Sequence, residues 1–203
     1  LKERYADYSP QTKVRFFESL YADNPTNENK YSFISALQSN GQTEEALKLI
    51  NEILNKFPKN LILNITKSEI LLSGQRLDDA KQIIDEVLKI SPNNYPASIL
   101  KSKILSAKKE TIKAEEILRD LLISKNRNPS LWMQLSEVQR AGKNIVGYHL
   151  SRGEYFTLIG DFDNALNQFQ FALGLSGNSF QTSETIMTKI KFVQSRLAKR
   201  RGI

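Results

Sequence analysis

A repeat of 34 residues is the feature that most constrains how this chain can fold. Asn60, Asn94 and Asn128 recur at this spacing, and Thr26 lies one period before the first of them. Asn and Thr side chains accept hydrogen bonds from the backbone N–H groups at a helix start, so we expect each of these residues to cap a helix. Pro129 directly follows the last of them and suits the first position of a helix.

Each period has the pattern of two helices joined by a turn. Apolar residues within 50–57 follow the i, i+3, i+4, i+7 spacing of one helix face. Gly41 and Gly74 mark the turn in the middle of their units, whereas Pro58 and Pro92 close the units. A unit of this kind buries its apolar face only against neighbouring units, so the sequence predicts a stacked array. No strand pattern competes with this interpretation.

Small residues at the centre of the second helix complete a resemblance to the tetratricopeptide repeat (TPR). They are Ala46, Ala80 and Ala114, and the stretches "NGQTEEALKLINEILNKFPKN" and "GDFDNALNQFQFALGL" match the repeat most clearly. The chain departs from the pattern in its single Trp, Trp132, and in having Ile34 or Ser where the first helix of a repeat has glycine. The resemblance implies an all-α fold, a TPR-like superhelical array of antiparallel helix pairs with about 9–11 helices, as a single domain over residues 1–203.

The period loses step after Ala114, because the next matching alanine, Ala165, follows one and a half periods later. We interpret the intervening helix, residues 145–159, as shared, the second helix of one unit and the first helix of the next. Gly153 and Phe156 stand in the small and aromatic columns of a first helix, as this interpretation requires. The predicted units are about 27–60, 61–94, 95–128, 129–159 and 145–177, and a C-terminal helix covers about 180–200.

The sequence holds no catalytic or metal-binding motif. The only histidine, His149, lacks the second imidazole of the His-Glu-x-x-His motif, and Glu154 lies off its helix face. The absence of cysteine excludes disulfides and thiolate chemistry. We therefore expect neither catalysis nor a cofactor in this chain, and we interpret His149 as part of the scaffold, with a pH-sensing role as the alternative. Three acidic pairs are expected at the starts of second helices, where they favour the helix dipole: Glu44–Glu45, Asp78–Asp79 and Glu115–Glu116.

Basic charge gathers at one end of the chain. The formal net charge is +7, and residues 189–203 hold six Lys or Arg residues and no acid. Nucleic-acid-binding surfaces spread basic residues along a face and add aromatic groups. We therefore interpret the tail as a solvated helix end and do not expect nucleic acid as a partner, with a tail contact to nucleic acid or an anionic membrane as the alternative. No apolar run reaches the ~18–20 residues of a membrane span.

The last third of the chain resembles a more specific family. The stretch "LWMQLSEVQRAGKNIVGYHLSRGEYFTLIGDFDNALNQFQFAL" precedes "FQTSETIMTKIKFVQSRL", whose Ile186, Ile190, Val193 and Leu197 share one helix face. This order is similar to the C-terminal repeat domain of periplasmic HExxH zinc metalloproteases of the BepA (YfgC) type. The resemblance implies a periplasmic protein with a zinc-holding protease domain N-terminal to this chain and a role in outer-membrane protein quality control. None of the family's zinc ligands matches a position here.

The resemblance also implies polypeptide partners, including unfolded outer-membrane proteins, their assembly machinery and the chain's own protease domain. First helices line the concave face of such arrays, and a mixture of apolar and charged groups there suits extended peptide. The groove candidates are Tyr31, Ser35, Gln38, Ile62, Ile65, Glu69, Leu72, Ile99, Lys103, Ser106, Met133, Glu137 and Arg140. For Ile65 and Ile99 the alternative is packing between neighbouring first helices. On the shared helix, Arg152 and Glu154 are candidates for contacting the protease domain. The alternative function is a free-standing cytoplasmic scaffold without a protease.

Overall fold

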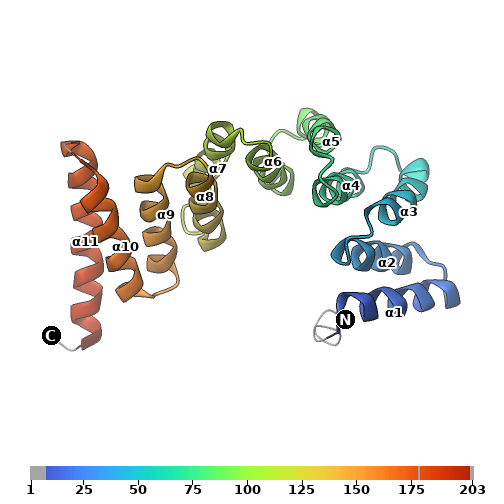
Figure 1. Cartoon of the computed structure of the whole chain (residues 1–203), viewed down its shortest axis with the longest axis horizontal. Coiled ribbons are helices and arrows are strands. Elements are labelled where there is room, and N and C mark those ends of the chain that lie inside the picture. Colours follow the sequence, from blue (N-terminus) through green and yellow to red (C-terminus); the bar gives the residue numbers. More distant parts are fainter. Residues whose placement is uncertain (1–7, 178, 202–203) are drawn as a thin grey trace. The chain divides into compact units, whose positions relative to one another are not determined.

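The computed structural model describes residues 8–177 and 179–201 (Figure 1). This part of the chain contains eleven helices joined by turns and no strand. The helices are α1 (Pro10–Asp23), α2 (Asn27–Ser39), α3 (Thr43–Lys56), α4 (Leu61–Ser73), α5 (Leu77–Ile90), α6 (Tyr95–Ala107), α7 (Thr111–Lys125), α8 (Pro129–Ala141), α9 (Ile145–Leu158), α10 (Phe162–Leu175) and α11 (Phe180–Arg201). The predicted all-α fold is confirmed.

The four residues predicted to cap helices do so. Thr26, Asn60, Asn94 and Asn128 each accept a backbone N–H through a side-chain oxygen, over 3.0 to 3.2 Å, at the starts of α2, α4, α6 and α8. Such caps satisfy N–H groups that have no partner within the helix. We call these four helices the A helices.

A residue in the left-handed region follows each A helix. The four residues with this conformation are Gly41, Gln75, Lys109 and Lys143, with φ of +76°, +59°, +66° and +60°. In each turn the next backbone N–H bonds to the carbonyl five residues back, as Gln42 does to Leu37 over 2.9 Å. This is the hydrogen bond of a Schellman motif, which ends one helix and redirects the chain. We call the helices that follow these turns, α3, α5, α7 and α9, the B helices.

The turn after α9 has the same geometry half a period later. Gly160 has a φ of +79°, and the N–H of Asp161 bonds to the carbonyl of Phe156 over 2.9 Å. The helix α9 therefore starts as a B helix does and ends as an A helix does. It contacts both α8 and α10. That residues 145–159 are shared by two repeat units stays a prediction.

Close approach, and not backbone freedom, explains the glycine at the end of α4. Gly74 marks the turn as expected, but the left-handed residue is its neighbour Gln75. A Cβ on Gly74 would lie 2.4 Å from Cγ2 of Thr43, at the start of α3. Gly142 and Thr111 repeat this arrangement, with 2.8 Å from the added Cβ to Oγ1. Each glycine thus lets the start of a B helix approach the end of the next A helix.

The alanines at the centres of the B helices α3, α5 and α7, and the matching alanine of α10, lie where helices meet. Ala46, Ala80, Ala114 and Ala165 have no exposed surface. The buried Ser68 of α4 donates its hydroxyl to the carbonyl of Ala80 in α5 over 2.8 Å. The small columns of the A and B helices therefore meet, which allows the close packing that the repeat pattern predicts.

Two compact units divide the chain within α6, the first ending at Ile104. In the first unit, α1 to α5 contact one another in order, and α6 adds Ala97, Leu100 and Ile104 to the same core. This core is mainly aliphatic, and the fully buried residues include Ile34, Leu37, Ile50, Ile70 and Ile84. The division into five predicted units within a single domain stays a prediction.

In the second unit, which begins at Leu105, α7 to α11 contact one another in order. Three residues of α11, Ile186, Val193 and Leu197, are buried in a cluster with α10, and Ile190 packs against it. The predicted apolar face of the last helix is therefore confirmed. Gly153 of α9 lies against the ring of the buried Phe169 in α10, and a Cβ there would be 2.3 Å from Cε1.

Replacing Gly153 by Ala tests how tightly α9 and α10 pack. Forcing a methyl group against Phe169 is expected to destabilise the fold by about 1–3 kcal/mol, which outweighs the gain of up to about 1 kcal/mol in helix propensity. Urea unfolding followed by circular dichroism measures the change. The control is Gly174→Ala in α10, where no atom lies within 4 Å of the added Cβ. It is expected to be neutral or mildly stabilising, and equal losses for both variants would contradict the packing argument.

Candidate functional site

In the first unit, polar side chains connect the neighbouring A helices α2 and α4. The hydroxyl groups of Tyr31 and Thr66 are 2.9 Å apart, and Gln38 Nε2 donates to Ser73 Oγ over 3.4 Å. Ser35 donates its hydroxyl to the backbone carbonyl of Tyr31 within α2. The three groove candidates of α2 thus lie together on the side that faces α4, and Tyr31 keeps 36% of its surface exposed.

The apolar candidates on this face differ widely in exposure. Ile62 of α4 is 69% exposed, whereas Ile65, one turn further along, is 8% exposed and belongs to the core. Leu72 packs partly against that core, and Ile99 of α6 is half-buried. Ile65 therefore has the packing role that was the alternative for it. Ile62 is the apolar side chain that this face offers to a ligand.

The charged candidates of the first unit are Glu69 of α4 and Lys103 of α6, and both are exposed. Loss of water around its carboxylate raises the pKa of Glu69, and the positive charge of Lys103 opposes that rise. The A-helix face of the first unit therefore combines one exposed aliphatic residue with hydroxyl, amide and oppositely charged groups.

Most groove candidates of the second unit contact other side chains of the same chain. Glu137 and Arg140 form an ion pair on α8, with 2.6 Å between Oε2 and Nη2. Met133 Sδ lies 3.0 Å from Nη1 of Arg152 in α9. Ser106, at the end of α6, is half-buried. Glu137, Arg140 and Met133 therefore each contact another residue of the chain.

The two residues expected to contact a protease domain also have partners in the second unit. The guanidinium of Arg152 lies 4.8 Å from the ring centre of Phe156, a cation–π distance. Glu154 forms an ion pair with Lys189 of α11. One charge of the basic C-terminal segment is therefore neutralised within the fold. Whether a protease domain contacts Arg152 and Glu154 stays a prediction.

His149 is packed against α10. Its Nδ1 lies 2.9 Å from Gln168 Oε1, and its ring centre lies 5.4 Å from that of Phe171. No group of three His, Asp or Glu side chains in residues 8–177 and 179–201 is arranged to hold a metal ion. These contacts are those of a helix–helix packing residue.

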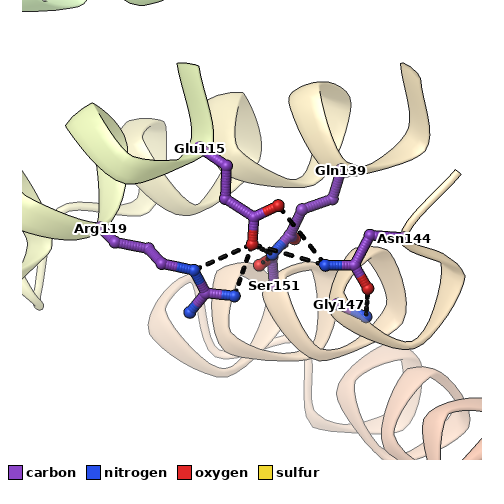
Figure 2. A network of polar contacts seen from close by, with 6 residues as sticks. All are labelled: Glu115, Arg119, Gln139, Asn144, Gly147 and Ser151. Atoms are coloured by element: carbon purple, nitrogen blue, oxygen red, sulfur yellow. Dashed lines mark hydrogen bonds and ion pairs between the residues drawn. The ribbon is translucent and has the colours of Figure 1, made fainter. Parts of the chain in front are cut away.

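A polar network joins α7, α8 and α9 (Figure 2). Gln139 is 1% exposed and stands in the column of Leu37, Leu71 and Leu105. Its Nε2 donates to Glu115 Oε1 over 2.9 Å, and its Oε1 accepts the hydroxyl of Ser151 over 2.7 Å. Since both ends of the buried amide are satisfied, the polar group is tolerated in the interior.

Glu115 is the centre of this network. Figure 2 shows Arg119, Gln139 and Asn144 directed at its carboxylate, and the shortest contact is 2.6 Å from Arg119 Nη2. Asn144 also caps α9 by accepting the N–H of Gly147. Burial opposes the charge of Glu115, but the hydrogen bonds from Gln139 and Arg119 outweigh it and lower its pKa below the ordinary value.

The helix-dipole role expected of the acidic pairs holds for two of the three. Glu44–Glu45 and Asp78–Asp79 lie in the first turns of α3 and α5. The first turn of α7 contains no acid, because this helix begins at Thr111. The expectation was therefore wrong for Glu115–Glu116, and the role of Glu115 is to hold the polar network together.

A groove of about 460 Å³ lies between α3, α4 and α5 in the first unit, on the side of the B helices. Leu47 and Leu71 are buried at its base, and Lys48, Asn51 and Lys67 are among the polar residues that line it. All the groove candidates predicted from the sequence lie on A helices, so this site was not predicted.

A family model of the tetratricopeptide repeat matches residues 37–90 and 71–137, which includes three of the four left-handed turns between A and B helices. Residues 37–137 are tetratricopeptide repeats. The described chain as a whole is a TPR-like helical repeat array. The comparison with curated proteins gives no significant match.

Solved TPR structures share this fold over nearly all of the chain. A TPR protein from Parabacteroides merdae is 17% identical over 95% of this chain and 80% of its own, with a TM-score of 0.58. A thermophilic TPR protein of Thermus thermophilus is 18% identical over 93% and 94%, with a TM-score of 0.56. YrrB, described as a TPR protein with an unusual peptide-binding site, is 12% identical over 91% and 97%, with a TM-score of 0.56. At these identities the likeness shows the fold alone.

One position of the TPR pattern could have indicated the polar network from the sequence. A glutamine in a column that is leucine in three preceding units needs buried hydrogen-bond partners. The sequence alone does not say which residues supply them, because they come from α7 and α9 as well as α8. None of the described helices combines the length and apolar character needed to cross a bilayer.

Replacing Glu115 by Gln tests the network through its pH dependence. Because the folded pKa of Glu115 is below its value of 4.5 in the unfolded chain, the charge stabilises the fold above that pH, and this stabilisation is lost as the pH falls through the folded pKa. The variant is expected to lose about 1–3 kcal/mol at pH 7 and little at pH 3. Chemical denaturation at both pH values measures this. Glu116→Gln, at the exposed neighbouring position, is the control, and an equal loss there would refute the assignment.

Proposed function

We propose that this chain is a non-catalytic interaction module that binds extended polypeptide on the A-helix face of its first unit. The observation that carries the proposal is Ile62, which leaves 69% of its surface uncovered on a face otherwise formed by polar groups. An aliphatic side chain beside hydroxyl, amide and charged groups suits a peptide, because a peptide offers side chains and backbone groups at the same time. YrrB, a protein of the same fold, is described as having a peptide-binding site, which supports this ligand class.

Charge on the same face favours peptides of mixed character. Glu69 and Lys103 are both exposed on adjacent A helices, and each offers a contact for the opposite charge. Tyr31 and Gln38 are tied to α4 by hydrogen bonds, so part of this surface is fixed before a ligand arrives. A surface ordered in advance loses less conformational entropy on binding.

The resemblance of residues 131–197 to BepA-type proteases extends the proposal to a biological setting. In this setting the module holds unfolded outer-membrane proteins and regulates an attached periplasmic zinc metalloprotease. In this proposal the zinc and the catalytic residues belong to that other domain. Arg152 and Glu154 of α9 are the proposed contacts with the protease domain. A free-standing cytoplasmic scaffold is the competing function.

The variant Ile62→Ser tests the binding face. Removing an exposed aliphatic contact is expected to weaken binding of reduced, carboxymethylated lactalbumin, an unfolded protein, by about tenfold, equivalent to about 1.4 kcal/mol. Fluorescence anisotropy of the labelled lactalbumin measures the affinity. The matched control is Ile90→Ser, because Ile90 is 67% exposed at the end of the B helix α5. Equal affinities of the two variants would place the binding site elsewhere.

The gene that encodes the chain tests the biological setting. A protease partner in the same polypeptide requires an HExxH motif within a few hundred codons upstream of Leu1. Sequencing this region decides between the two settings. A start codon directly before Leu1 would contradict the protease proposal and favour the scaffold.

A further inference from the structure

The groove between α3, α4 and α5 has a base of aliphatic residues and polar walls. Leu47 and Leu71 are almost fully buried at the base, and Ile83 of α5 is half-buried beside them. The volume of about 460 Å³ accommodates a few residues of a peptide. All three helices belong to the first unit, so this site is defined within one compact body.

The charges at one end of the groove are already paired. Arg76 Nη2 lies 2.8 Å from Asp79 Oδ2, and its Nη1 lies 3.7 Å from Glu44 Oε1. The guanidinium is therefore neutralised by two carboxylates of the chain itself. These carboxylates also disfavour a ligand as highly charged as a phosphate ester at this end, because like charges repel.

Lys67 of α4 is different. It lines the groove and is half-buried, yet no carboxylate, hydrogen-bond acceptor or aromatic ring of residues 8–177 and 179–201 engages its ammonium group. A partly buried cation without a partner loses water on one side and gains no compensating contact. Lys48 also lines the groove but is exposed, so Lys67 is its half-buried positive charge that favours an external anion.

In the next repeat, the lysine that corresponds to Lys67 is paired with a carboxylate. One period after Lys67 stands Lys101, and one period after Asn51 stands Asp85. Lys101 Nζ lies 2.8 Å from Asp85 Oδ1, and Lys81 Nζ lies 2.6 Å from Oδ2. Burial opposes the charge of Asp85, but the two lysines hold its pKa below the ordinary value. In the groove, the neutral amide of Asn51 replaces this carboxylate and leaves Lys67 unpaired.

We propose that the groove binds an acidic segment of a partner polypeptide, with a Glu or Asp carboxylate of the partner on Lys67. The incoming carboxylate takes the place that Asp85 has beside Lys101, and an adjacent apolar side chain of the partner covers Leu47 and Leu71. This site rests on the proposed function, since its ligand is polypeptide, but it lies on the B-helix side and is separate from the face around Ile62. A half-buried, unpaired ammonium beside an aliphatic base fits one carboxylate next to one apolar residue.

Two peptides test the ligand chemistry with the whole chain. The first is acetyl-Gly-Ile-Glu-Leu-Gly-amide, and the second has Gln in place of Glu and differs only in charge. Titration of the ¹⁵N-labelled protein, followed by ¹H–¹⁵N correlation spectra, gives both the affinity and the site. We expect the Glu peptide to shift amide signals of α3 to α5 and to bind at least about tenfold more tightly than the Gln peptide at low salt.

Two substitutions test the role of the unpaired lysine. Lys67→Gln removes the ammonium, and Asn51→Asp supplies the internal carboxylate that the next period has. Both are expected to reduce the affinity for the Glu peptide by about tenfold or more, the second without any loss of positive charge. The matched control is Lys101→Gln, which removes the equivalent lysine that is already paired and is expected to leave the affinity unchanged. Circular dichroism confirms that each variant is folded.

The outcomes separate this site from the proposed function. The site is refuted if the Glu peptide does not bind at millimolar concentration, if both peptides bind equally, or if Asn51→Asp binds as tightly as the unchanged protein. In each of these cases, binding of unfolded lactalbumin that depends on Ile62 would leave the proposed function standing. If the protein without substitutions does not bind unfolded lactalbumin, the proposed function is refuted instead.

Discussion

The left-handed turn at the end of each A helix is the constraint on which the rest of this structure depends. A backbone N–H bonds to a carbonyl five residues back at every one of these turns, from Gln42 and Leu37 to Asn144 and Gln139. Since the backbone sets the turn, three of the four A-helix turns are formed by Gln or Lys and not by glycine. Side chains one period apart therefore meet equivalent neighbours, and the small residues of the B helices are all buried.

A fixed period gives each departure from a column a local physical meaning. Gln139 stands where earlier units have a core leucine, and its buried amide forms hydrogen bonds with Glu115 and Ser151. Asn51 stands one period before Asp85 and has a neutral amide in place of that carboxylate, so Lys67 stays unpaired in the described chain. The first substitution binds three helices of the second unit to one another. The second leaves a charge for a partner. The same framework thus produces structural rigidity in one place and a binding site in another.

The sequence predicted those features that depend on local and periodic order. Caps such as Asn60 and the buried face of α11 follow from residue type and helical spacing, because each involves only neighbours along the chain. Contacts between helices were harder to foresee. The pairing of Glu154 with Lys189 depends on which helices lie side by side and on the reach of two long side chains. The groove on the B-helix side was not predicted for the same reason, because its lining comes from three helices that meet only in the folded chain.

The double role of α9 has a consequence for how such an array grows. Ordinary repeats are added or lost in pairs of helices, because an A helix without its B helix leaves an apolar face uncovered. On the shared-helix interpretation, α9 closes one pair with α8 and opens another with α10, and it contacts both helices. An array that contains such a helix can change its length by one helix at a time. Every later helix then takes the opposite role, A or B, from the one that an uninterrupted period would give it.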